Sequence, residues 1–169
     1  MTTSEHEMEK VIPVRPARLS DAEGIAYLTA QLGYEVEGPA VSDRLSRILL
    51  QPGQRFLVAE REDRLVGWVH AIVWEFVETG AFVVIGGLVV DRSLRKQGIG
   101  RTLLANAETW AVEQGCSVVR LWSSIARTEA HRFYEQLGYR NLKSQYSFVK
   151  SVGPRAEDDF RGFIPRVDQ

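Results

Sequence analysis

The chain has 169 residues, of which 44% are hydrophobic and 25% are charged, the size and composition of one globular domain. Its 21 Lys and Arg residues nearly balance 22 Asp and Glu, and the formal net charge of −1 argues against a nucleic-acid partner, which a broadly basic surface would attract. The one cysteine, Cys116, excludes an intrachain disulfide and a multi-thiolate metal site, so we expect no metal and favour a reducing, cytoplasmic location.

The N-terminal half predicts a strand, two helices and a hairpin. Residues 1–10 are polar and acidic, so we expect them to be disordered, and they lack the apolar core of a signal peptide. No apolar run reaches the roughly 20 residues of a membrane-spanning helix, and no membrane partner is expected. Ser20 and Glu23 have the spacing of a capping box that begins a helix. The expected elements are a strand at 11–18, helices at about 21–32 and 42–50, and strands at 56–59 and 65–74 with a turn at 60–64.

The C-terminal half alternates strands with helices. Residues 81–90 are almost wholly apolar, as in a central strand that is buried on both faces. Apolar residues at helical spacing and short β-prone runs follow, and they predict a helix from 99 to about 111, a strand at 117–123, a helix at 130–137 and one or two short strands at 139–150. The order is therefore βααβββαβαβ, an α/β fold. Residues 151–169 are expected to be a poorly ordered tail, in which Phe160, Phe163 and Ile164 could dock on a second subunit.

The segment from Leu88 to Arg101 joins the central strand to the next helix through a glycine-containing loop. The first backbone N–H groups of a helix are unpaired and partly positive, and Gly98 and Gly100 leave room for a bulky anion to approach them. Local positive charge comes from four cations of this segment, Arg92, Arg95, Lys96 and Arg101. A phosphate or pyrophosphate is the predicted ligand. The P-loop motif is absent because no Gly-Lys pair exists, and the dinucleotide fingerprint fails because Leu103 replaces its third glycine.

Two segments then resemble the GNAT (GCN5-related) N-acetyltransferases. Residues 95–100, Arg-Lys-Gln-Gly-Ile-Gly, match the acetyl-CoA motif Q/R-x-x-G-x-G/A, and residues 130–139, Ala-His-Arg-Phe-Tyr-Glu-Gln-Leu-Gly-Tyr, match A-x-x-F-Y-x-x-x-G-F/Y. Residues 14–21 also resemble the family's first strand and helix cap. The resemblance covers residues 11–150. It implies a mixed central sheet with helices on both faces, and an enzyme that moves an acetyl group from acetyl-CoA directly to a primary amine.

The resemblance also implies where acetyl-CoA binds. The pantetheine arm would pair with the backbone of the central strand at Leu88, Val89 and Val90, and the pyrophosphate would meet the loop and the first helical turn. Those residues are Arg95, Lys96, Gln97, Gly98, Ile99, Gly100 and Arg101. Arg127 stands where an Asn is frequent in the family, so a contact with the cofactor arm is expected to be absent or remade.

For catalysis the resemblance assigns Tyr134 as the general acid that protonates the departing CoA thiolate. Many members carry a glutamate general base on the central strand, but Gly86 stands at the aligned position here. The base is therefore expected elsewhere. The candidates are His70, Glu75, Glu78, Glu35, ordered water and bulk solvent.

The acceptor amine is expected between the loop that joins the first two helices and the neighbouring strands. Aromatic and acidic side chains there suit a cationic small-molecule amine, and they are Tyr34, Glu35, Trp68, Trp74 and Glu78. Residues 130–145 also resemble the small-amine branch that includes aminoalkylphosphonate and aminoglycoside acetyltransferases. A protein or peptide acceptor stays open, as does a non-catalytic acyl-CoA-binding module, and a homodimer is a further expectation.

Overall fold

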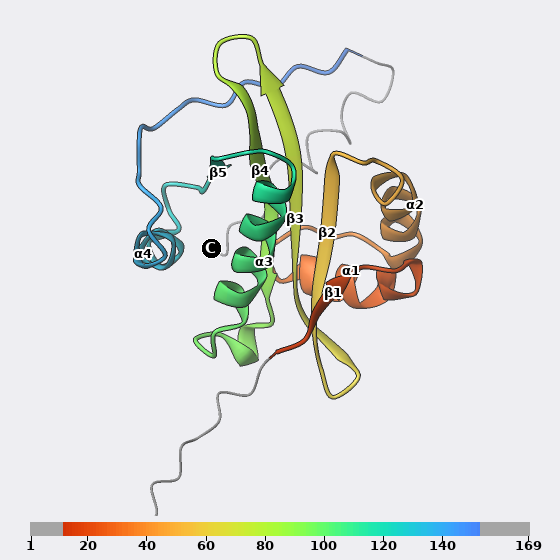
Figure 1. Ribbon diagram of the computed structural model, residues 1–169. Coiled ribbons are helices and arrows are strands. Elements are labelled where there is room, and N and C mark those ends of the chain that lie inside the picture. The colour runs from red at the N-terminus through yellow and green to blue at the C-terminus, as the bar shows by residue number, and fades with distance from the viewer. Residues whose placement is uncertain (1–11, 153–169) are drawn as a thin grey trace, which may run out of the picture.

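Residues 12–152, which the computed structural model describes, form a five-stranded sheet with helices on both faces (Figure 1). The strands are β1 (Val14–Pro16), β2 (Gln54–Arg61), β3 (Arg64–Phe76), β4 (Gly80–Val90) and β5 (Val119–Leu121), and the helices are α1 (Ala22–Ala30), α2 (Gly38–Ile48), α3 (Ile99–Glu113) and α4 (Thr128–Gln136). The predicted order is confirmed from the first strand through the last helix. The expected disordered N-terminus and the tail with Phe160, Phe163 and Ile164 lie outside the described residues.

The strands follow one another across the sheet in the order β1-β2-β3-β4-β5. The first four are antiparallel neighbours, and β5 is parallel to β4 because α3 carries the chain back across the sheet. Glu62 and Asp63 both adopt positive φ, of 52° and 57°, which is the two-residue turn that the right-handed twist of a β2–β3 hairpin favours. The predicted mixed sheet is thus confirmed.

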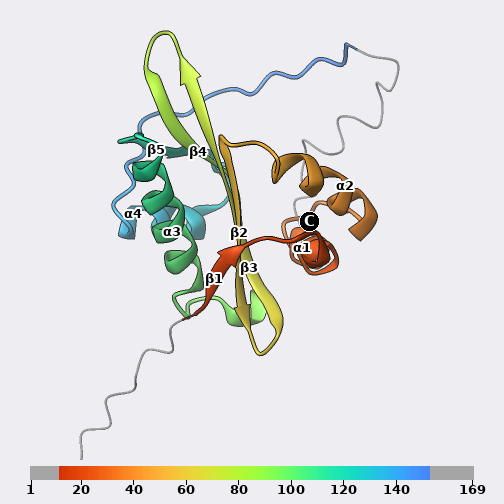
Figure 2. The same cartoon turned by 45° about the vertical axis from the view of Figure 1, so that its right-hand side comes forward.

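Helix α3 covers one face of the sheet and the α1–α2 pair covers the other (Figure 2), and alternating side chains divide the core between these two faces. On β2, Leu57 and Ala59 pack toward α3, whereas Phe56 and Val58 pack toward α1 and α2. The predicted apolar stripe of the third helix is buried throughout, and it consists of Ile99, Leu103, Leu104, Ala107, Trp110 and Ala111. One face of the sheet is therefore covered by α3 and the other by the α1–α2 pair.

The starts of the first two helices differ from the prediction. Ser20 and Glu23 do not form the expected capping box, and a short 3₁₀ helix, Leu19–Asp21, precedes α1 instead. Asp21 is buried, accepts the Arg18 N–H at 2.7 Å and forms an ion pair with Arg15 at 2.8 Å. α2 begins at Gly38 rather than near 42, because Pro in its first turn fits the helix start and leaves no interior donor unpaired.

The strands expected at 139–150 are not formed, and this part of the prediction is wrong. Residues 140–150 run past α4 as an exposed segment without strand structure (Figure 1), whereas Tyr139 is half-buried against the core. A strand needs a hydrogen-bonded neighbour, and along the described chain none lies beside this segment. Its apolar side chains are consequently left open to solvent.

Replacing Asp21 with alanine tests the anchor of the first helix. The Asp21→Ala variant leaves the Arg18 N–H and the Arg15 guanidinium without their partner, and we expect it to lower the free energy of unfolding by about 2 kcal/mol. Asp43→Ala removes only the exposed Asp43–Arg47 pair on α2 and should cost about 0.3–0.5 kcal/mol. Urea unfolding at pH 7 measures both losses, and equal losses would contradict the anchor role.

The loss of stability in the Asp21→Ala variant should depend on pH. Burial raises the pKa of Asp21, but hydrogen bonds from Arg15 and the Arg18 N–H outweigh it and hold the pKa below its usual value. A lowered folded-state pKa stabilises the fold above the unfolded-state pKa of about 4, and this contribution disappears as the pH falls toward the folded-state value. The stability difference between wild type and Asp21→Ala should therefore shrink in unfolding experiments below about pH 4.

Candidate functional site

The centre of the candidate site is a bulge in β4. The register of β3 and β4 pairs His70 with Gly87 but Ala71 with Ile85, so Gly86 is an extra residue without a partner on β3. A β-bulge bends its strand and changes the face on which the following side chains lie. Val89, beyond the bulge, accordingly belongs to the core beneath α1 and α2, whereas Val83 and Ile85, before it, belong to the core beneath α3.

β4 and β5 also part at the bulge. β5 pairs with β4 only from Val83 to Ile85. Within residues 12–152 no strand lies beside the β5-facing edge of 86–90, so this edge is open to an extended ligand that pairs like a strand. The sequence-predicted pantetheine residues Leu88, Val89 and Val90 form this edge. Ser123, just beyond β5, has a buried hydroxyl for which the described chain provides no hydrogen-bond partner.

A buried aspartate fixes the loop that follows β4. Asp91 accepts hydrogen bonds from the N–H and the hydroxyl of Ser93 at 2.9 and 2.7 Å, and from Arg64 at 2.9 Å. The hydrogen bonds from Ser93 are the main reason that the pKa of Asp91 lies below its usual value, with burial opposing them and Arg64 adding to them. The carboxylate thus holds the start of the basic loop against the β2–β3 hairpin.

The loop ends in a cradle of backbone donors at the start of α3. Gly98 precedes the helix with φ of +81°, a left-handed conformation that glycine adopts without strain. The N–H groups of residues 99–101 have no backbone acceptor among the described residues, as expected for a first helical turn. Gly100 permits close packing, since a Cβ there would lie 3.1 Å from the Phe133 ring of α4. The cradle therefore adjoins the helix that carries Tyr134.

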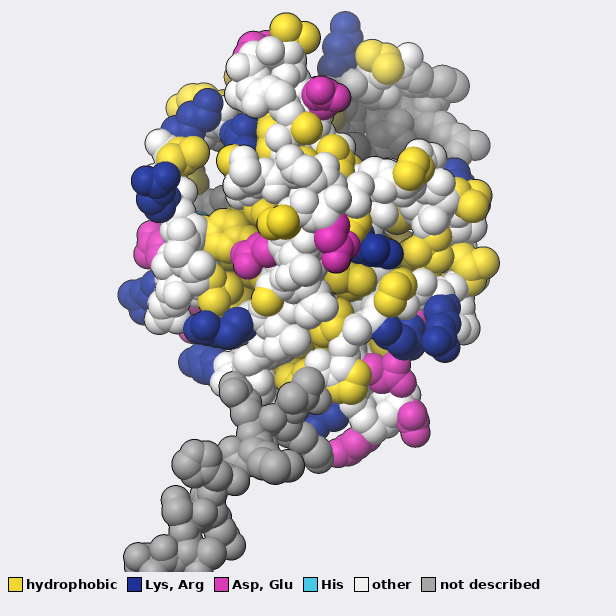
Figure 3. All heavy atoms as spheres, viewed as in Figure 1, with side chains coloured by type: hydrophobic (Ala, Val, Ile, Leu, Met, Phe, Trp, Pro, Cys, Tyr) yellow, Lys and Arg dark blue, Asp and Glu magenta, His cyan; other side chains and the backbone are white. Residues whose placement is uncertain are grey.

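Positive charge surrounds these donors. Arg95, Lys96 and Arg101 are exposed beside the cradle, Gln97 accepts a hydrogen bond from Arg61 at 3.0 Å, and the side chain of Ile99 is buried in the core. On the face shown in Figure 3, Lys and Arg side chains gather beside α4 and at the lower left, and hydrophobic side chains show between α3 and α4. Backbone donors and cations thus lie together, which suits a phosphorylated ligand.

Tyr134 lies on α4 among aromatic side chains. Its ring centre is 5.2 Å from that of Phe133 and 5.8 Å from that of Tyr139, whose hydroxyl donates to Glu108 at 2.7 Å. Burial raises the pKa of Tyr134, with the charge of Arg127 opposing the shift, so its phenol keeps its proton at neutral pH. Arg127 itself donates to the Leu32 carbonyl at 3.3 Å, a contact with the protein.

His70 lies on β3 directly opposite the bulge. Its Nε2 is 2.9 Å from Oε1 of Gln54, an acceptor, so Nε2 carries the ring proton and Nδ1 keeps a free lone pair. Nδ1 lies 3.6 Å from the point where a Cβ of Gly86 would stand. Burial lowers the pKa of His70 to about 4, so the imidazole is neutral at pH 7. A hydrogen-bond acceptor therefore occupies the place where the family resemblance leads us to expect an acid.

Trp68 lies beside His70 and contacts the other glycine of the bulge region. The six-membered ring of Trp68 is 2.6 Å from the position of a Cβ at Gly87, so only glycine fits there without a shift. The opposite edge of the indole carries Nε1, which is buried and lacks a hydrogen-bond partner within residues 12–152. The Phe56 ring packs against both Trp68 and His70, with centres 5.2 and 5.3 Å away.

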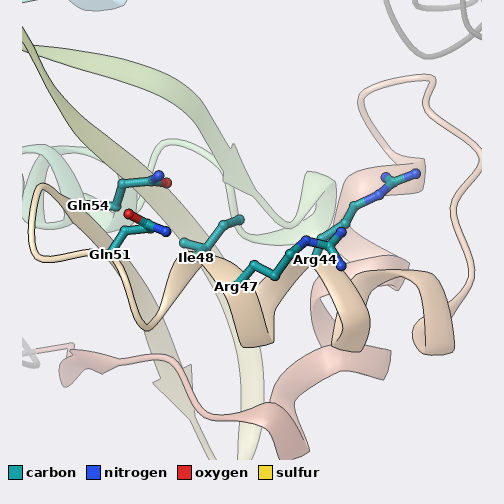
Figure 4. Close-up of a pocket in the computed structure, with 5 residues that line it drawn as sticks. All are labelled: Arg44, Arg47, Ile48, Gln51 and Gln54. Atoms are coloured by element: carbon teal, nitrogen blue, oxygen red, sulfur yellow. The ribbon is translucent and has the colours of Figure 1, made fainter. Parts of the chain in front are cut away.

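Two adjoining hollows open between α2 and the sheet on this side, with volumes of about 310 and 130 Å³. Arg44 and Ile48 line both of them. The larger is lined by Arg44, Arg47, Ile48, Gln51 and Gln54 (Figure 4), and the smaller by Ile25, Thr29, Val36, Val41, Arg44, Leu45, Ile48, Phe56 and Trp68. We call the two hollows together the α2 groove. Through Gln54 and Trp68 the α2 groove adjoins His70 and Gly87.

The residues that the sequence predicts around the acceptor lie in two separate places in the structure. Trp68 lines the α2 groove, and Tyr34 and Glu35 lie in the loop between α1 and α2. Trp74, Glu75 and Glu78 lie instead toward the far end of the β3–β4 hairpin, where Trp74 packs on Trp122 at 5.4 Å. Trp74 is six residues from Trp68 along one strand, about 20 Å. The structure does not bring this group to His70 or to the α2 groove.

Apart from Trp68, sequence reasoning did not identify the residues of the α2 groove. Arg44, Arg47, Ile48 and Gln51 are spaced at i, i+3, i+4 and i+7, a pattern that places them on one face of a helix. The pattern was available in the sequence, but a mixed polar stripe is also typical of a solvent-exposed helix. Gln54 lies on the next strand, and its pairing with His70 depends on the register of β2 and β3.

Three further observations concern the cysteine, metal-binding clusters and membrane-spanning helices. Cys116 is buried and forms no disulfide, as expected for a small core residue. No cluster of His, Cys, Asp or Glu suited to a metal ion occurs among the residues that the structure describes. Over the same range, the search for a helix of sufficient length and hydrophobicity to span a membrane found none.

Comparison with known proteins identifies the family. Residues 22–139 match the model of the Acetyltransferase (GNAT) family. The chain is 32% identical to an aminoalkylphosphonate N-acetyltransferase of Salmonella typhimurium over 149 residues, which cover 85% of this chain and 96% of that protein. It is 32% identical over 98 residues to the human N-acetylaspartate synthetase, which cover 58% and 32% of the two chains.

A solved structure shows the same fold. An aminoglycoside N-acetyltransferase in complex with CoA superposes with a TM-score of 0.76 at 19% identity, covering 83% of this chain and 95% of that one. The family match, which spans most of the chain, agrees with the strand order and with the two motifs of the sequence. The protein therefore belongs to the GNAT family of acetyltransferases and is an acyltransferase that moves an acetyl group to an amine.

Proposed function

We propose that the protein transfers the acetyl group of acetyl-CoA directly to the primary amine of a small molecule, with Tyr134 as general acid. The observation that carries the proposal is the arrangement at the β4 bulge. An open strand edge leads into a cradle of backbone donors, and the free nitrogen of His70 faces the bulge from the neighbouring strand.

The chain's own residues fit acetyl-CoA at this place. The open edge of residues 88–90 offers backbone groups to the pantetheine arm, and the unpaired N–H groups at 99–101 with Arg95 and Lys96 offer donors to the pyrophosphate. The bound cosubstrate would supply a thioester, whose carbonyl carbon accepts the amine. Gly98 leaves room for the cosubstrate to approach the loop, since no described atom lies within 4 Å of the position of a Cβ there.

The proton transfers follow from the two ionisable groups. The amine lone pair forms the C–N bond, and the amine nitrogen becomes far more acidic once it is bonded to the carbonyl carbon, so the weakly basic Nδ1 of His70 can accept its proton. As the C–S bond breaks, the sulfur takes the electron pair, and the phenol of Tyr134 donates its proton to the thiolate. A backbone N–H at Val89 or Val90 would stabilise the oxyanion.

The named relatives support a small acceptor. One is an aminoalkylphosphonate N-acetyltransferase over nearly its full length, and one structural neighbour is an aminoglycoside N-acetyltransferase. The α2 groove is of a size for a small molecule. We also propose the cytoplasm as the location, because a single buried thiol fits a reducing compartment.

Removal of the Tyr134 hydroxyl tests the general acid. Tyr134→Phe keeps the aromatic packing of α4, so we expect normal acetyl-CoA affinity by calorimetry and a kcat lowered about 100-fold in a thiol-release assay. Tyr27→Phe is the matched control, because Tyr27 is an exposed tyrosine on α1. An unchanged kcat in Tyr134→Phe would remove the proposed role. Acetylation of a peptide amine in preference to every small amine would contradict the small-molecule acceptor.

Substitution of His70 tests the acceptor of the amine proton. His70→Gln should lower kcat about 100-fold without weakening acetyl-CoA, whereas His131→Gln on α4, the matched control, should leave it unchanged. Because the pKa of His70 is about 4, its ionisation should leave no step in the rate profile between pH 5 and 8.

Nitrogen NMR of the imidazole provides an independent readout of the same assignment. The wild type should show the tautomer with the proton on Nε2, and Gln54→Leu should redistribute the proton between the two nitrogens because it removes the acceptor. A proton on Nδ1 in the wild type would overturn the role of His70.

We further propose that the protein is a homodimer in which the segment after α4 is exchanged. We call residues 140–152 the C-terminal arm. Four of its side chains, Leu142, Tyr146, Phe148 and Val152, are between 77% and 93% exposed, and all four share the parity of one strand face. β5 has β4 on one side and, within the described chain, no strand on the other. If each C-terminal arm paired with the sheet of the partner subunit, its exposed apolar side chains and the unpaired edge of β5 would both be covered. Because the exchange is reciprocal, the result would be a dimer with twofold symmetry.

Light scattering after size exclusion tests the dimer. We expect the wild type at twice the chain mass, and the double variant Tyr146→Ser/Phe148→Ser at the monomer mass, because the exposed apolar face of the arm is lost. Val77→Ser removes an equally exposed apolar residue at the hairpin tip and should stay dimeric. A monomeric wild type whose arm amides are protected from hydrogen exchange would show that the arm packs within one chain.

A further inference from the structure

The residues that line the α2 groove are suited to bind an acidic group. We infer that the acceptor is an amine that also carries an acidic group, and that Arg44 and Arg47 bind this group in the α2 groove while the amine lies at the β4 bulge. The inference rests on the proposed function and specifies its substrate class. It departs from the cationic acceptor that the sequence predicted.

The α2 groove contains donors and lacks carboxylates. None of the residues that line its two hollows is Asp or Glu. Arg44 is exposed and has no ion pair within the described part of the chain, and Arg47 holds only the exposed partner Asp43, four residues earlier on the same helix. Exposed pairs of this kind are weak, so Arg47 is available to a ligand. A polycation would therefore find no counter-charge here, and an anion would find two.

Figure 4 shows how the polar groups are distributed. The arginines follow one another along α2, with Ile48 beyond them, and Gln51 and Gln54 lie at the opposite end of the hollow. Gln54 holds Nε2 of His70 at 2.9 Å, and the other nitrogen of that ring faces Gly86. One end of the groove is thus basic, and the other end adjoins the bulge where the amine must be neutral to react.

The buried indole of Trp68 agrees with a groove that is rich in donors. Trp68 lines the smaller hollow and is only 8% exposed, and its Nε1 has no partner among the described residues. An indole N–H is a donor and never an acceptor, so the group that satisfies it must present a lone pair. A carboxylate or phosphonate oxygen does so, whereas an ammonium group does not. The two arginines and the unpaired indole N–H therefore all select an acceptor atom.

Matched amines in a thiol-release assay test the inference. For chains of two to four methylenes, we compare an ω-aminoalkylphosphonate, the amino acid of equal length and the uncharged alkylamine, alongside a polyamine and an aminoglycoside. The acid-bearing amines should have kcat/KM at least 10-fold above the alkylamine. Preference for the polyamine, the aminoglycoside or a peptide amine would overturn the inference but leave acetyl transfer established, whereas no thiol release with any amine would overturn the proposed function itself.

Variants of the groove separate binding of the acid from catalysis. Arg44→Ala and Arg47→Ala should each raise KM for the acid-bearing amine about 10-fold and leave its kcat and the KM of the alkylamine unchanged, because a charge-assisted hydrogen bond is lost. Arg140→Ala, an exposed arginine beyond α4, is the control. Arg44→Glu should reverse the preference toward the polyamine. Equal effects on charged and uncharged amines would mean that the arginines only support α2, and would overturn the inference.

Discussion

The extra residue in β4 is the constraint on which the rest of the site depends. Without Gly86, the register of β3 and β4 would continue unbroken, and β4 would keep its side chains on the same faces throughout. With it, β4 bends where its pairing with β5 ends, so one strand edge becomes available to a ligand. The same bend aims the strand at the loop that Asp91 anchors and at the first turn of α3. The open edge of β4 therefore follows from this one extra residue.

The bulge also explains why a histidine stands on β3 opposite a glycine on β4. A Cβ at Gly86 would lie 3.2 Å from Cδ1 of Ile72, which is a tight contact, and 3.6 Å from Nδ1 of His70, which is an ordinary van der Waals distance. At Gly87 a Cβ would overlap the Trp68 ring. Nδ1 of His70 thus lies beside the point where the side chain of a family-type acid would begin, and the hydrogen bond with Gln54 orients the ring.

Local sequence patterns predicted most of the fold. The features that they did not predict depend on pairing between segments that are distant in the sequence. The stripe from Ile99 to Ala111 and the apolar run at 81–90 indicated α3 and β4 correctly, because both signals lie within one element. The bulge was out of reach, since Gly86 is unpaired only in relation to the register of β3. The predicted strand segment at 139–150 has the alternation of a strand, but a strand exists only where a neighbour pairs with it. For the same reason Gln54 could not be linked to His70, nor Trp74 separated from Trp68.

The electrostatics of the proposed acceptor site agree with its weak base. In the proposed complex Arg44 and Arg47 would bind the acidic group at one end of the α2 groove, and the amine would lie at the other end, beside the bulge. The base then has only to accept a proton from a nitrogen already bonded to the acetyl carbon, which suits an imidazole whose pKa burial has lowered to about 4. In the proposed reaction His70 would receive this proton, and the basic end of the α2 groove would bind the acidic group of the substrate.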